Sequence, residues 1–160
     1  MTEGKEFIEQ LLLGIMDDIK KDMRAKGQYA SGATERLWEI KMIEKPTELE
    51  GQLWGPSYLM ALITGRGPTK SGGGGGPTLQ QKLREWIDFK GIGGTDKVKT
   101  SISWAMAKVM HEKGNVLHRT GADTGLLKNN ITDSRILAAV DSFTSSQIDK
   151  VMAEINPLFK

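Results

Sequence analysis

The chain has 160 residues, of which 38% are hydrophobic, and a formal net charge of +2. This composition fits one domain with a real core, and the charge is too small to indicate nucleic-acid binding by the whole chain. The absence of cysteine excludes a disulfide framework, a thiol nucleophile and a thiolate metal site. No apolar run reaches the roughly 18 residues of a membrane-spanning helix, and the acidic N-terminus is unlike a signal peptide.

The first element is a long amphipathic helix. Apolar residues recur at three- and four-residue steps over residues 3–26, from Phe7 to Met23. We predict one helix there, with a single apolar stripe, ending at Gly27. At about 1.5 Å per residue it would exceed 30 Å. This is long for a small domain, so part of its stripe is expected to face another subunit.

Two strands are expected next. Residues 36–45 alternate, with Trp38, Ile40 and Met42 on one side, and the run stops at Pro46. Residues 47–54 form a second candidate strand, which gives a hairpin around Pro46. Two strands alone are marginally stable, so this pair should pack on the long helix or on further strands.

The middle of the chain changes from apolar to glycine-rich and then to helical. Pro56 suits a first helical turn, and a short apolar helix follows to Gly65. Residues 65–77 are glycine, proline and basic residues, and we expect a mobile loop. A capping-box pattern at Thr78 and Gln81 opens a helix over 78–90, and a second helix is expected over 97–113.

The last part of the chain is predicted as a loop over 115–129 and two short helices. The first helix would carry Ile136 to Phe143, and the second would begin at a cap near Ser145 or Ser146. Each of the four tryptophans (38, 54, 86 and 104) falls on an apolar face. This favours core positions for most of them, although aromatic residues are also enriched where subunits meet.

No constellation for catalysis stands out. Lys70-Ser71 follows threonine, not glycine, and five glycines separate it from the next helix, so the P-loop pattern is not met. His111 and His118 are seven residues apart, whereas histidine pairs that bind metal on a helix are usually four apart. Asp17 and Asp18 are adjacent on a polar helix face. We therefore expect no enzyme, no cofactor and no metal.

The glycine-rich loop permits a different function. Flexible cations such as Arg66, Lys70 and Lys82 can contact phosphates, so a small nucleic-acid-binding protein is an alternative. The helix that carries Lys82 also carries Glu85 and Asp88. For that reason ordinary solubility or subunit contacts are the preferred interpretation of these charges.

The order of motifs over residues 3–114 resembles the tail-completion and neck (head–tail connector) proteins of tailed bacteriophages. A long helix and two strands lead to Leu53-Trp54-Gly55-Pro56, then Ser57-Tyr58, an apolar segment and Gly65-Arg66-Gly67-Pro68. The segments 86–92 and 103–114 resemble an insertion found in such proteins from phages of gut bacteria. The acidic residue usual before the loop glycine is absent, because Ile63-Thr64 stands there.

The resemblance implies an α+β fold, with a long N-terminal helix packed on a small antiparallel sheet and additional helices in the C-terminal half. It implies a single domain over 1–160, containing the loop 65–77, a helical insertion 78–114 and C-terminal helices 130–160. The implied role is a virion structural protein that forms a homo-oligomeric ring in the neck or upper tail, made in the bacterial host cytoplasm. Its expected partners are portal, adaptor or tail proteins, with incidental contact to packaged DNA and none to membrane. The expected contact residues are Trp54, Pro56, Tyr58, Arg66, Gly67, Pro68, Thr69 and Lys70.

Overall fold

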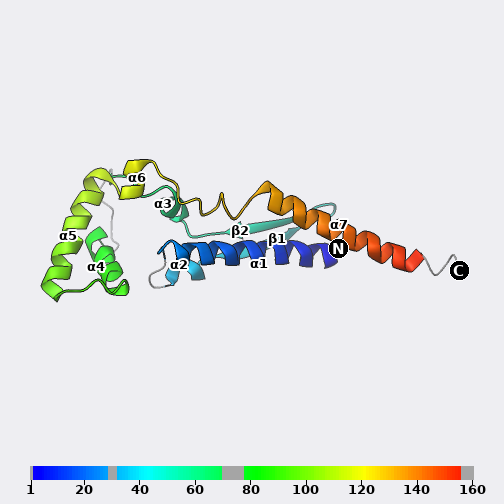
Figure 1. Ribbon diagram of the computed structural model, residues 1–160, viewed down its shortest axis with the longest axis horizontal. Helices are drawn as coiled ribbons and strands as arrows, with labels where there is room; N and C mark the ends of the chain where they lie inside the picture. The colour runs from blue at the N-terminus through cyan, green and yellow to red at the C-terminus, as the bar shows by residue number, and fades with distance from the viewer. Residues whose placement is uncertain (1, 29–31, 70–77, 156–160) are drawn as a thin grey trace. The chain divides into compact units, whose positions relative to one another are not determined.

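The computed structural model describes residues 2–28, 32–69 and 78–155. The fold is α+β, as predicted, and Figure 1 labels its elements along the chain. By its internal contacts the chain divides into two compact units. The helix–hairpin unit comprises residues 1–19, 40–53 and 127–160, and the helical unit comprises residues 20–39 and 54–126.

Helix α1 (Thr2–Ala25) is the predicted long helix, and it contributes residues to both units. It ends at Gly27, which has a positive φ of 67°. The Gln28 N–H donates to the Met23 carbonyl (2.9 Å), and the Gly27 N–H donates to the Arg24 carbonyl (3.0 Å). These two bonds form a Schellman motif, which requires a left-handed residue at the position of Gly27. The predicted stop is therefore confirmed.

In the helix–hairpin unit, β1 (Glu39–Glu44) and β2 (Leu49–Trp54) form the predicted hairpin. Lys45 and Glu48 exchange backbone hydrogen bonds across the turn, so Met42 lies opposite Gly51. A Cβ added at Gly51 would lie 2.8 Å from Leu12 Cδ1 and inside the contact distance of Ile8 Cγ2. The glycine thus lets α1 pack directly on the strand backbone, which confirms the helix-on-sheet arrangement.

Helix α7 (Asp133–Ile155) lies antiparallel along α1 in the same unit. Asp18 pairs with Arg135 (2.9 Å), the rings of Phe7 and Phe143 stack with centroids 4.5 Å apart, and Glu3 pairs with Lys150 (2.9 Å). The expectation of two short helices is wrong, because α7 continues through Ser145 and Ser146. Both serines are exposed, so their hydroxyls face solvent and need not interrupt the helix.

The helical unit contains five helices in its described residues: α2 (Ala33–Arg36), α3 (Leu59–Ile63), α4 (Leu79–Phe89), α5 (Asp96–Lys113) and α6 (Val116–Thr120). The capping box that opens α4 is confirmed. The Gln81 N–H donates to Thr78 Oγ1 (3.2 Å), and the Thr78 N–H donates to Gln81 Oε1 (2.7 Å). The structure corrects two expectations, because α2 includes Arg36, where the first strand was expected to begin, and α6 lies inside the expected loop 115–129.

The buried side of α5 is formed by small residues. Ser103 and Ala107 are its buried residues, whereas Ala105 and Val109 are exposed. Ser103 lies against α4, where its hydroxyl accepts a hydrogen bond from Gln80 (2.7 Å) and donates to the Thr100 carbonyl. Small residues at 103 and 107 bring the two helices close. A hydrophobicity pattern misses this because it gives serine no weight.

Among the helices formed by residues 2–28, 32–69 and 78–155, none combines the length and apolarity needed to cross a bilayer.

Candidate functional site

The aromatic corner after β2 exposes two of its three predicted contact residues. Pro56 is buried, whereas the exposed fractions of Trp54 and Tyr58 are 52% and 41%. The Tyr58 hydroxyl makes a hydrogen bond with Thr34 Oγ1 (3.1 Å). Trp54 and Tyr58 are therefore not simply core residues. They present ring surface that a partner can cover.

The buried indole at this corner belongs to Trp38, which is 8% exposed. A Cβ added at Gly55 would lie 3.2 Å from two atoms of the Trp38 ring, so the glycine lets the chain turn tightly over it. The expectation that most tryptophans are core is wrong, because Trp86 and Trp104, at 37% and 63% exposed, join Trp54 on the surface.

The first part of the glycine-rich loop is attached to the helices that follow it. The Asn115 N–H donates to the Arg66 carbonyl (2.9 Å), and the Thr69 N–H donates to the His111 carbonyl (3.0 Å). Gly65 has a φ of 89°, and a Cβ there would collide with Asn115 and His118. Residues 65–69 therefore have defined contacts, in contrast to the mobile loop expected from the sequence. The remainder of that loop, including the predicted contact residue Lys70, lies outside the described residues.

Arg66 is directed toward its own loop. Its Nη2 donates to Thr69 Oγ1 (2.9 Å), and its Nη1 is buried without a hydrogen-bond partner among the described residues. Gly67 lies against the imidazole of His118, since a Cβ there would be 3.2 Å from His118 Cε1, while Pro68 is exposed. A phosphate contact needs cations that reach solvent, so this geometry does not favour Arg66 for that role.

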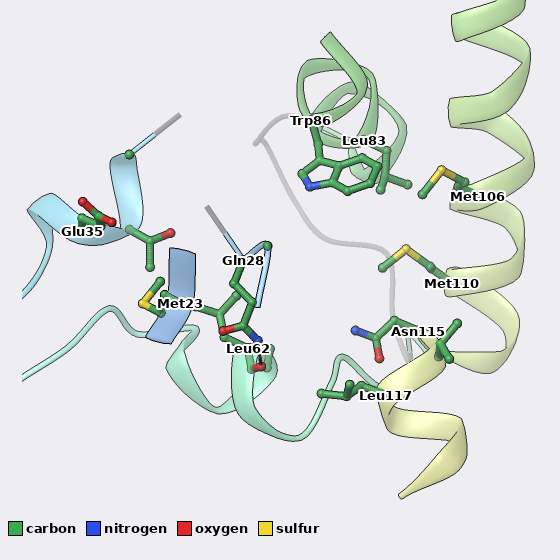
Figure 2. Close-up of a pocket in the computed structure, with 15 residues that line it drawn as sticks. Met23, Gln28, Glu35, Leu62, Leu83, Trp86, Met106, Met110, Asn115 and Leu117 are labelled. Carbon is green, nitrogen blue, oxygen red and sulfur yellow. Dashed lines mark hydrogen bonds between the residues drawn. The ribbon is translucent and has the colours of Figure 1, made fainter. Parts of the chain in front are cut away.

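A pocket of about 570 Å³ lies wholly in the helical unit, and the sequence analysis did not predict it. Figure 2 shows that α1, α3, α4 and α5 all contribute to it. Its main apolar lining is Met23, Leu62, Leu83, Trp86, Met106 and Met110.

The volume of this pocket is in the range of pockets that bind small molecules, and methionine side chains adapt to varied apolar shapes. The i, i+4 spacing of Met106 and Met110 was the available sequence signal. This spacing indicated that the two methionines point inward, but it did not indicate that a cavity lies beside them.

Two polar side chains at this pocket, Gln28 and Glu35, make hydrogen bonds, whereas Gln28 Oε1 is buried without a partner among the described residues. Gln28 donates from Nε2 to the Leu62 carbonyl (2.9 Å). Glu35 accepts from Arg24 Nε and Nη2, each at 2.7 Å, and these hydrogen bonds lower the pKa of Glu35. A carboxyl group with a lowered pKa stays ionised at neutral pH, so Glu35 is poorly suited to donate a proton.

A charge network joins α4 and α5 at a separate place. Arg84 bonds to both Asp88 and Asp96, and Lys99 donates to Asp88 (2.9 Å). The bond from Lys99 is the largest cause that lowers the pKa of Asp88, followed by the charge of Arg84. Within the described ranges there is no group of three or more His, Asp or Glu residues placed to hold a metal ion.

No known protein family, no curated protein and no solved structure matches this chain.

Proposed function

We propose that this chain is a structural subunit of a tailed-phage virion, which forms an oligomeric ring in the neck or upper tail. The proposal rests on the resemblance over residues 3–114 and on one observation, the amount of large apolar side chain that the folded chain leaves exposed. Monomeric proteins rarely expose extended apolar patches, and exposed aromatic residues are typical of subunit contacts. In this proposal the exposed surface is covered by identical neighbours and by a portal, adaptor or tail protein.

Both units supply such surface. Helix α7 has no buried residue, and Leu137, Ile148 and Val151 are each more than half exposed. In the helical unit Trp54 and Trp104 are more than half exposed. The aromatic corner at Trp54 and Tyr58 is the part of the predicted contact set that is best suited to dock a partner.

The decisive experiment is a mass measurement by light scattering and by native mass spectrometry. The chain is measured alone and then with a portal-type protein from a tailed phage. We expect a defined oligomer, or a complex with the portal protein, that withstands high salt. A chain that remains a monomer at all concentrations and ignores every such partner would exclude the proposal.

The alternative function, nucleic-acid binding through the glycine-rich loop, has less support because Arg66 is engaged with Thr69. It predicts binding to a DNA duplex that weakens steeply as salt rises. Absence of binding to the duplex at low salt would exclude this alternative function.

A further inference from the structure

The two units carry opposite net charges. The helix–hairpin unit has seven basic and twelve acidic residues, a formal charge of −5. The helical unit has fifteen basic and eight acidic residues, a formal charge of +7. The two values sum to the +2 of the whole chain, which hides the asymmetry. Opposite charges on two parts of one chain favour attraction between unlike parts of different copies.

The exposed face of α7 is both acidic and apolar. Its apolar side chains from Leu137 to Ile155 recur through five turns, and Leu137 is 61% exposed. The two basic residues of the helix, Arg135 and Lys150, are paired with Asp18 and Glu3 of α1. Its four acidic residues form no ion pair within the described chain: Asp133, Asp141, Asp149 and Glu154.

The outer face of α5 has the complementary character. Trp104 is 63% exposed. Lys97, seven residues before Trp104, and Lys108, four residues after Trp104, lie on the same side of the helix as its ring. Neither lysine forms an ion pair within the residues described, whereas Lys99 and Asp96 are used by the network with α4. The lysine stems can also cover part of an apolar neighbour while their ammonium groups reach its carboxylates.

We propose that the acidic face of α7 in one copy binds the Trp104 edge of α5 in a neighbouring copy. This inference rests on the proposed ring and names the contact that would build it. Two α7 faces paired with each other would place Asp141 and Asp149 against like charges, which disfavours a symmetric α7 dimer. A contact between unlike faces is heterologous, and such contacts generate rings when their rotation closes.

The test uses two full-length variants with reversed charge. Asp141→Lys/Asp149→Lys reverses the charge at two of the four acidic positions of α7 and leaves α5 intact. Lys97→Glu/Lys108→Glu reverses the charge of both lysines beside Trp104 and leaves α7 intact. Analytical ultracentrifugation should show that each variant alone associates at least about tenfold more weakly than the native chain. An equimolar mixture should recover association, because each variant then meets a partner of opposite sign. Circular dichroism checks that both variants fold.

The matched control is Glu9→Lys/Asp17→Lys, which makes the same charge change in the same unit. These two exposed acidic residues of α1 are also eight positions apart, as Asp141 and Asp149 are. The control should associate like the native chain apart from a small uniform change. If it loses association as fully as the α7 variant does, net charge alone is responsible and the assigned contact is wrong.

Other results separate this inference from the proposed function. Native-like oligomers from both reversed-charge variants would overturn the α7–α5 contact while the ring proposal stands. A native chain that never associates, with or without a portal-type protein, would overturn both. If Lys97→Glu/Lys108→Glu abolishes binding of a DNA duplex but leaves self-association unchanged, the basic face serves a polyanion and the inference fails.

Discussion

At the residue scale, Gly51 determines how closely the hairpin approaches α1. Its missing side chain leaves room for Ile8 and Leu12, which lie on the apolar stripe of the helix. A strand residue with a Cβ would push the two elements apart. The position therefore couples the register of the hairpin to the packing of the helix–hairpin unit.

We expect Gly51→Ala to lower the free energy of unfolding by about 1–3 kcal/mol, the usual cost of overpacking. Urea denaturation measures this change. Gly93→Ala is the matched control, because a Cβ there meets no atom within 4 Å and its φ is not positive. Equal effects of the two substitutions would mean that the contact with α1 does not set the cost.

The tryptophans show what residue patterns can and cannot predict. The alternation around Trp38 correctly indicated a half-covered side, but Trp104 also lies among apolar residues and is 63% exposed. A pattern marks which side of an element is apolar. Whether another element covers that side depends on tertiary packing, which no local pattern contains. The attachment of the loop at Arg66 and Thr69 was unpredictable for the same reason, since the backbone groups that bond to it belong to Asn115 and His111, far along the chain.

At the scale of elements, the start of α4 was predictable because capping is local chemistry. Thr78 and Gln81 need only each other, three residues apart. The course of α7 was not predictable in the same way. Its continuation depends on ion pairs and ring stacking with α1, more than 100 residues earlier.

Thr78→Ala should lower stability by about 1 kcal/mol, because it removes the side-chain bond to the Gln81 N–H. Thr95→Ala is the comparison, since Thr95 occupies the N-cap of α5 but makes no capping bond from its side chain. Thermal unfolding of both variants should show the larger shift for Thr78. A larger loss at Thr95 would contradict the assigned cap.

The attachment of α7 to α1 should depend on pH. Hydrogen bonds from Lys150 and then Gln147 lower the pKa of Glu3 in the folded chain. A lowered pKa contributes stability that is present above the ordinary pKa of glutamate and is lost as pH falls through the folded value. The difference in Tm between the native chain and Glu3→Gln should therefore exist at neutral pH and vanish in acid.

At the scale of the whole molecule, a polar substitution on the exposed apolar surface should weaken self-association, whereas one in the buried core should lower the stability of the fold. Leu137→Ser should change the free energy of unfolding by no more than about 0.5 kcal/mol, because its side chain is 61% exposed. It should nonetheless weaken self-association. Ile87→Ser, at a position with 0% exposure, should destabilise the chain strongly. Light scattering and denaturation together separate the two effects.

The methionine lining of the pocket in the helical unit makes it vulnerable to peroxide. Met60 is 61% exposed and should be converted to the sulfoxide first, while Met23, at 0% exposure, should resist longest. Once an oxygen is added to Met106 or Met110, the apolar lining of the pocket gains a polar group, which weakens its packing. Peptide mass spectrometry after graded oxidation should show this order, and loss of helical content should coincide with the later products. The extent of methionine oxidation would then determine how long a preparation of this chain stays folded.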